Sequence, residues 1–167
     1  MLPETIRTAR LVLRPPRLED VQVIFDRYAQ DAEVTRYLTF RPHRKPSETE
    51  AFIRGCTQAW AGDTRRPWVL TRVDAGGGAV GMLDLRQHRY RANVGYVLAR
   101  AEWGQGLMTE ALQAVADLVL AQDRSSAQPL TACVCSHAQF PGFPADPSAS
   151  ERRQASTELC TWSASFI

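Results

Sequence analysis

Apolar residues between positions 107 and 122 recur at intervals of three and four. They are Leu107, Met108, Ala111, Leu112, Val115, Leu118 and Val119, while Glu110, Gln113, Asp117 and Gln122 fall largely between them. This spacing puts the apolar side chains on one face of an α-helix and the polar ones on the other. The pattern predicts a long amphipathic helix that packs on a sheet.

Four earlier segments, residues 10–14, 68–73, 79–85 and 93–100, have the alternation or the composition of β-strands. Helical spacing of apolar residues at 18, 21, 24, 25 and 28 predicts a helix after the first strand. The sequence Ser47-Glu48-Thr49-Glu50 has the form of a capping box and predicts a second helix before the second strand. This order of elements predicts an α+β fold, with a mixed, mostly antiparallel central sheet flanked by helices.

Two glycines, Gly104 and Gly106, stand between the strand at 93–100 and the long helix. Glycine lets the backbone approach a ligand closely, and the N–H groups and dipole at a helix start favour an anion. A pyrophosphate would fit such a turn, although many Gly-x-Gly turns serve only close helix–strand packing. The spacing matches neither the dinucleotide fingerprint nor the P-loop.

Three short motifs lie around this turn: Gly95-Tyr96-Val97-Leu98, Trp103-Gly104-Gln105-Gly106 and Thr109-Glu110-Ala111. They resemble motifs of the GNAT N-acetyltransferases, in particular of the RimJ/RimL-like branch. The opening of the chain resembles the same branch through Thr8, Arg10, Leu11, Leu13, Arg14 and Asp20. The resemblance covers roughly residues 7–135.

The resemblance implies transfer of an acetyl group from acetyl-CoA to a primary amine, by direct attack in a ternary complex. In the family, a bulge or splay in the strand before the turn leaves backbone groups free for pantetheine, and an N–H there polarises the thioester carbonyl. The residues implied to hold acetyl-CoA are Val97, Leu98, Ala99, Trp103, Gly104, Gln105, Gly106, Leu107, Met108 and Thr109, with Leu98 as the oxyanion contact. The implied contacts of the acceptor are Tyr37, Phe40, His43 and Tyr96. Core packing would explain Tyr37 and Phe40 equally well, and a solvated loop would explain His43 equally well.

A protonated amine must lose a proton before it attacks the thioester. Many relatives carry Glu two residues before the Gly-Tyr pair, where this chain has Asn93, and an amide cannot act as a base. Asp84 is the best remaining carboxylate, with Glu110 and a water relay as substitutes. A solvated strand position would explain Asp84 equally well, and a favourable first-turn position explains Glu110 better.

The composition is that of an ordinary globular protein, with 44% hydrophobic and 23% charged residues and a net charge of +2. No run of basic residues indicates a nucleic-acid or membrane-surface partner, and no apolar stretch indicates a leader or a membrane span. A cytoplasmic protein with reduced thiols is expected, and no metal site. Cys133 and Cys135 would share one face of a strand, where packing explains them better than a metal shared with outside ligands.

Residues 129–135 predict one more strand, parallel to the strand at 93–100 and reached over the long helix. Beyond it, the last helix and two strands of the family are not recognisable, and Pro141, Pro144 and Pro147 make a helix improbable. The expected organisation is an acetyltransferase domain at 1–135 and an irregular tail at 136–167. As the origin of this tail, a frameshift is favoured over a naturally disordered terminus. The fold would then be incomplete at its C-terminal side, and a homodimer would cover the exposed edge.

The acceptor is expected to be a protein N-terminus or an amino-acid-like small molecule. The alternatives are a catalytically inactive CoA-binding module and a protein-interaction domain in which the two glycines serve only packing.

Overall fold

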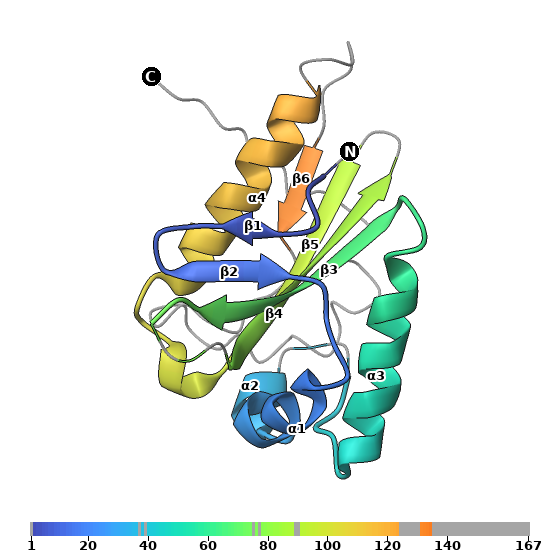
Figure 1. The fold of residues 1–167 in the computed structure, drawn as a ribbon, viewed down its shortest axis with the longest axis vertical. Coiled ribbons are helices and arrows are strands. Elements are labelled where there is room, and N and C mark those ends of the chain that lie inside the picture. The colour runs from blue at the N-terminus through green and yellow to red at the C-terminus, as the bar shows by residue number, and fades with distance from the viewer. Residues whose placement is uncertain are drawn as a thin grey trace, which may run out of the picture.

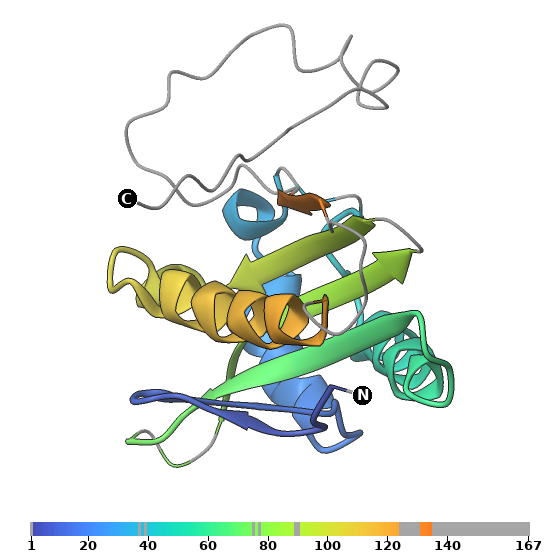
Figure 2. The same cartoon turned by 90° about the horizontal axis from the view of Figure 1, so that it is seen from above.

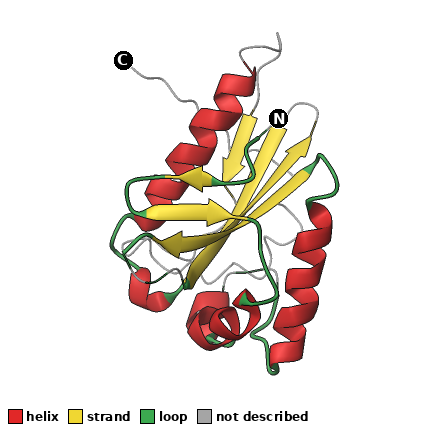
Figure 3. Ribbon diagram, in the orientation of Figure 1, coloured by secondary structure: helices red, strands yellow, loops and turns green. Residues whose placement is uncertain are grey.

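The protein, as a computed structural model, is described here over residues 2–36, 38, 40–74, 76, 78–88, 91–123 and 131–134. Its elements in chain order are β1 (Ile6–Arg7), β2 (Leu11–Arg14), α1 (Asp20–Ile24), the π-helical turn η1 (Phe25–Ala29), α2 (Ala32–Thr35), α3 (Pro46–Ala59), β3 (Arg65–Arg72), β4 (Ala79–His88), β5 (Arg91–Leu98), the 3-10 turn η2 (Arg100–Glu102), α4 (Leu107–Asp123) and β6 (Thr131–Val134). Figure 1 and Figure 3 show the helices grouped around one sheet.

The six strands form a single sheet in the order β1-β2-β3-β4-β5-β6. Neighbours from β1 to β5 are antiparallel, whereas β6 runs parallel to β5, with Arg91 opposite Thr131 and Val94 opposite Val134. Helix α4 connects these two parallel strands, as a crossover connection requires. The predicted α+β fold and the predicted parallel strand are both confirmed.

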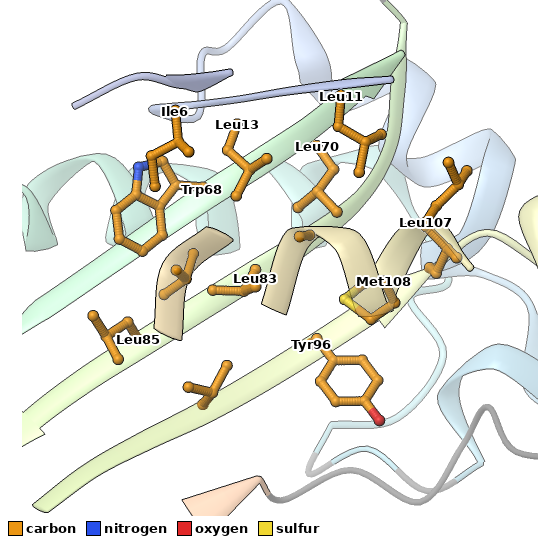
Figure 4. Close-up of a cluster of buried hydrophobic side chains, with 14 of the residues drawn as sticks. Ile6, Leu11, Leu13, Trp68, Leu70, Leu83, Leu85, Tyr96, Leu107 and Met108 are labelled. Atoms are coloured by element: carbon orange, nitrogen blue, oxygen red, sulfur yellow. The ribbon is translucent and has the colours of Figure 1, made fainter. Parts of the chain in front are cut away.

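The two faces of the sheet bury separate hydrophobic clusters. Val94, Tyr96 and Leu98 of β5 belong to the cluster under α4, which is drawn in Figure 4. Val97 and Ala99 point to the opposite face, into the cluster formed with α1, η1 and α3. Side chains alternate along a strand, so this division follows directly from the sequence of β5. In Figure 1, and in the view of Figure 2 turned by 90°, α4 and α3 flank opposite sides of the sheet.

Helix α3 does not start with the predicted capping box. It begins at Pro46, with Lys45 in the capping position and no side-chain cap, so that Ser47 lies inside the first turn. Proline suits the first helical position because its fixed φ matches the helix and its missing N–H is not needed there. Glu48 instead accepts a hydrogen bond from the Arg44 N–H at 2.9 Å. The predicted helix is correct, and its predicted cap is wrong.

Other boundaries differ from the pattern in the sequence. The first helix continues from α1 into the π-helical turn η1, which the apolar spacing alone did not indicate. Strand β3 starts at Arg65 rather than at the predicted residue 68, because Pro67 fits into the ladder opposite Asp84. No helix in the part of the chain that the structure describes is long and apolar enough to cross a lipid bilayer.

Gly81 and Gly95 lie on neighbouring strands but have opposite steric surroundings. A Cβ on Gly81 would overlap the carbonyl oxygen of Val97 and lie 3.2 Å from Cα of Leu98, whereas a Cβ on Gly95 would meet nothing within 4 Å. We therefore expect Gly81→Ala to lower the free energy of unfolding by about 1–3 kcal/mol. Gly95→Ala, the matched control, should leave it unchanged or raise it by roughly 0.5 kcal/mol. Urea unfolding measures both, and equal losses in the two variants would contradict the expectation.

Candidate functional site

The turn between β5 and α4 adopts a backbone conformation that favours glycine. Gly104 has φ of 74° and Gly106 has φ of 71°, both in the left-handed region. The Glu110 N–H donates to the Gly106 carbonyl at 3.1 Å, so α4 starts immediately after this glycine. The N–H groups of Leu107, Met108 and Thr109 therefore have no acceptor within the helix and lie at its positive end. This arrangement suits an anion.

A cleft of about 210 Å³ lies beside this turn. Its lining residues come from β5, the turn and α4, and they are Tyr96, Leu98, Glu102, Trp103, Gly104, Gly106, Leu107, Met108, Thr109 and Leu112. Most of the predicted acetyl-CoA residues are therefore brought together. In Figure 4, Met108 lies next to the ring of Tyr96. The cleft thus combines an apolar wall with the start of a helix.

Three of the predicted residues do not line this cleft. The side chains of Val97 and Ala99 are buried on the other face of the sheet. Gln105 is not among the lining residues, and its side-chain oxygen accepts a hydrogen bond from Arg72 at 2.8 Å. Tyr96, predicted as an acceptor contact, instead shares the cleft with the glycine turn. Glu102 and Leu112 also line the cleft, although neither was among the predicted site residues.

Trp103 anchors the turn to the end of β5. Its indole N–H donates to the Leu98 carbonyl at 2.8 Å, and its ring packs against both hydrophobic clusters. Arg72 of β3 holds the turn from the other side, since it pairs with Glu102 at 3.1 Å as well as with Gln105. These contacts fix the position of the two glycines relative to the strand, although no periodic pattern in the sequence predicts the Arg72 contacts.

Glu110, the substitute base, is occupied outside the cleft. Its carboxylate accepts hydrogen bonds from the backbone N–H of Arg10 at 2.9 Å and from Arg10 Nε at 2.6 Å. Hydrogen bonds from Thr8 and Arg10 hold the pKa of the Glu110 carboxyl below its ordinary value. A carboxylate held in this way is a poor proton acceptor, so the structure favours the helix-start interpretation of Glu110.

The edge of β5 that faces away from β4 carries the backbone groups of Tyr96 and Leu98. The Ala99 N–H donates to the Val80 carbonyl at 2.8 Å, and antiparallel ladders alternate, so residues 97 and 99 bond toward β4 while residues 96 and 98 point the other way. Within the described residues, β6 pairs only with Arg91–Val94. The pairing with β4 is regular throughout, so no bulge lies on that side of β5.

Asp84 lies on the face of the sheet opposite to the cleft, directly across from Gly95. Both of its oxygens accept from Arg65 Nε, at 3.0 and 3.1 Å, and Oδ2 also accepts from Arg86 Nε at 3.2 Å. The Asp84 side chain is 19% exposed and that of Arg86 is 59% exposed. Asn93, opposite Arg86 in the ladder, shares this face. The carboxylate is thus partly accessible but already bound by two guanidinium groups.

The predicted acceptor wall is only partly described. Tyr37 lies outside the described residues. Phe40 packs against His43 and Phe52, with ring centroids 5.3 and 5.8 Å apart. His43 Nδ1 lies 2.8 Å from the Thr49 hydroxyl, and burial lowers the pKa of this histidine, which favours the neutral ring. Phe40 and His43 therefore form one aromatic group with α3.

Helix α2, between the first helix and this aromatic group, is tied to the turn region. Asp31 caps α2 by accepting from the Glu33 N–H at 2.9 Å, and its carboxylate also pairs with Arg100 of η2. The Arg100 and capping contacts together lower the pKa of Asp31, although its partial burial opposes them. This ion pair links the predicted acceptor wall to the segment that precedes Gly104.

Other chemistry finds little support among the residues whose placement is described. Cys56 is buried, Arg65 Nη2 lies 3.7 Å from its sulfur, and burial raises the pKa of the thiol to about 11, so it stays protonated near neutral pH. No group of three or more His, Cys, Asp or Glu side chains in that part of the chain could hold a metal ion. The side chains of Cys133 and Cys135 lie outside it.

Residues 10–139 match the family described as acetyltransferase (GNAT) domain. The chain belongs to the GNAT acetyltransferase family. This GNAT chain is also 34% identical over 116 residues to an uncharacterized N-acetyltransferase, p20, of Bacillus licheniformis. That alignment covers 68% of the chain and 65% of p20, so it spans slightly less than two thirds of the relative.

Solved acetyltransferases share the fold of this GNAT chain. A putative ribosomal-protein-serine acetyltransferase from Vibrio cholerae superposes with a TM-score of 0.65 at 19% identity, covering 94% of this chain and 83% of that one. RimL, a ribosomal L7/L12 alpha-N-protein acetyltransferase solved in complex with coenzyme A, superposes with a TM-score of 0.61 at 17% identity, covering 77% and 73%. The resemblance to the RimJ/RimL-like branch is thereby supported at the level of fold.

Proposed function

We propose that this chain transfers an acetyl group from acetyl-CoA to a primary amine. The observation that carries the proposal is the turn at Gly104 and Gly106, which presents the start of α4 beside a cleft on β5. In the proposal, the pyrophosphate lies against the N–H groups of residues 103–109, and the Thr109 hydroxyl donates one more hydrogen bond. The coenzyme A seen with RimL supports this choice of co-substrate.

The outward-facing edge of β5 would hold the pantetheine arm and the thioester. The backbone groups of Tyr96 and Leu98 point to this edge, and we assign the Leu98 N–H to the thioester oxygen, where negative charge develops. The amine nitrogen then attacks the thioester carbon directly, and the C–S bond breaks. Coenzyme A leaves as its thiol after it takes up a proton, and the amine loses one.

Asp84 is the residue we propose for accepting that proton. It lies on the face of the sheet opposite to the cleft, beside Gly95, where the missing side chain leaves open space. Residues 95–98 point alternately to the two faces of the sheet. An amine bound above Gly95 would therefore lie close to a thioester held at the edge of β5. The guanidinium groups of Arg65 and Arg86 already bind the Asp84 carboxylate and leave less of it accessible to the amine. A bridging water would then relay the proton from the amine to Asp84.

The acceptor proposed is a protein N-terminus or an amino-acid-like small molecule, with Phe40 among the residues that contact it. RimL, which shares this fold, is an alpha-N-protein acetyltransferase, and this supports the first of these. A second candidate function, a CoA-binding module without turnover, is favoured by Asn93 at the position of the family glutamate and by the two arginines on Asp84.

Calorimetry with acetyl-CoA on the purified chain tests the first half of the proposal, and thiol release with a panel of amines and N-terminal peptides tests the second. Binding together with amine-dependent thiol release is the expected result. Binding without thiol release from any acceptor would support the inactive module. No binding at all would overturn both, and would leave the two glycines with a packing role only.

A further inference from the structure

Arg10, just before β2, reaches across to the glycine turn. Its Nε donates to Glu110 at 2.6 Å and its Nη1 donates to the Gln105 carbonyl at 2.8 Å. The third nitrogen, Nη2, has no hydrogen-bond partner within the described residues. It lies 3.7 Å from the position that a Cβ on Gly106 would occupy, and the Arg10 side chain is 45% exposed. A guanidinium nitrogen is thus directed at the turn and accessible to a ligand.

Arg72, the other arginine at this turn, is used differently. Its Nε and Nη2 bind Asp74 at 2.8 and 2.7 Å, and its Nη1 is shared between Glu102 and Gln105. All three nitrogens of Arg72 therefore have partners in the protein, and its role is to hold the turn. Of these two arginines, Arg10 is the one that combines a fixed side chain with a nitrogen that has no partner among the described residues.

Glu110 explains how Arg10 keeps this orientation. The Glu110 carboxylate accepts hydrogen bonds from both the backbone N–H and Nε of Arg10. These two contacts fix the direction of the Arg10 side chain. Glu110 also places a negative charge in the first turn of α4, close to where an anion would lie. Arg10 compensates this charge. A planar guanidinium with a free edge is well suited to phosphate oxygens, because it offers several N–H donors in one plane.

We propose that Arg10 is a ligand for a phosphate group of coenzyme A, and that Glu110 and the Gln105 carbonyl act as positioning groups for it. The proposal rests on the acetyl-CoA site proposed above, and it assigns a further binding residue from the opposite end of the chain. It also gives a role to the cluster of Thr8, Arg10 and Glu110, whose members lie about 100 positions apart in the sequence but are in contact in the fold.

The unequal effects of two substitutions test this role. Arg10→Gln should raise the dissociation constant of acetyl-CoA about tenfold to hundredfold, as expected for the loss of one charge-assisted hydrogen bond. Glu110→Gln keeps Arg10 and its positive charge but holds the side chain less firmly, so the affinity should fall clearly less than in Arg10→Gln. If Arg10 only stabilised the structure through Glu110, the two variants would weaken binding equally, and that result would overturn the proposal.

Matched controls are available on α3, where Arg54 and Glu50 form an exposed ion pair at 2.6 Å. Arg54→Gln and Glu50→Gln make the same two changes in net charge away from the turn, and both should bind acetyl-CoA like the wild-type chain. Thermal unfolding of all four variants shows whether each remains folded. An effect of Arg54→Gln as large as that of Arg10→Gln would reduce the finding to a general charge effect and would contradict the proposed contact.

Dephospho-CoA, which lacks the 3′-phosphate, distinguishes the phosphate groups. If Arg10 binds the 3′-phosphate, the Arg10→Gln effect disappears with this ligand; if Arg10 binds the pyrophosphate, the effect persists. In either case the salt dependence of binding should decrease in the variant. Wild-type binding with no change in Arg10→Gln would overturn this inference alone, whereas absence of wild-type binding would overturn the proposed function itself.

Discussion

Replacing Gly106 by valine should lower the affinity for acetyl-CoA on the order of a hundredfold, a loss of about 2.7 kcal/mol. Gly106 has φ of 71°, which a β-branched residue adopts only with strain, and its carbonyl is the acceptor for the first hydrogen bond of α4. Relief of the strain would rotate the N–H groups of the first turn away from the ligand. Calorimetry on the wild-type chain and the variant gives the comparison.

Gly76 is the matched control for this experiment. It has φ of 67°, nothing lies within 4 Å of its Cβ position, and it belongs to the turn between β3 and β4. Gly76→Val should therefore carry a similar backbone strain of roughly 1–3 kcal/mol without any change in acetyl-CoA affinity. Equal affinity in Gly106→Val and wild type would show that the coenzyme does not use this turn.

The turn and its helix could be predicted from the sequence because both depend on local patterns. The glycine spacing, the three-and-four periodicity of α4 and the alternation in β5 each lie within a few consecutive residues, and the structure has all three. The division of β5 into a cleft side and an α3 side also follows from strand alternation. Local rules therefore predict the glycine turn, the helix and the strand faces that border the cleft.

The supporting contacts of the turn could not be predicted in the same way. Arg10 and Glu110 are 100 positions apart, and Arg72 is about 30 positions from its partners in the turn. Exposed or half-buried ion pairs have no periodic signature, and any of the many arginines could have been chosen. Only the register between β2, β3 and the start of α4 determines which of them meet.

The start of α3 illustrates a different difficulty. Two capping signals compete there, because Ser47 with Glu50 fits a capping box while Pro46 fits the first helical position. Both sequences are compatible with a helix, and the proline was the better guide. The predictions for residues 136–167, including a frameshift and an exposed edge covered by a homodimer, concern a part of the chain outside the described residues.

Replacing Asp84 by asparagine should lower kcat for amine acetylation by on the order of a hundredfold or more, if this carboxylate takes the proton from the amine. The affinity for acetyl-CoA should stay unchanged, because Asp84 and the cleft lie on opposite faces of the sheet. Asp63, 92% exposed and paired with Arg66, provides the control: Asp63→Asn removes the same charge and should retain wild-type kcat.

A purely structural role for Asp84 predicts a different result. Asp84→Asn would then lower the melting temperature, because Arg65 and Arg86 lose their partner, but kcat would stay within a few-fold of the wild-type value. A second variant, Arg86→Gln, also distinguishes proton acceptance by Asp84 from a purely structural role. It removes one of the two guanidinium groups from Asp84, so a proton-accepting carboxylate becomes more available and kcat should be retained or increased. A proton-accepting Asp84 therefore requires a loss of kcat in Asp84→Asn without a matching loss in Arg86→Gln. A kcat within a few-fold of the wild-type value in both variants, with a lower melting temperature, would assign this cluster to the stability of the sheet.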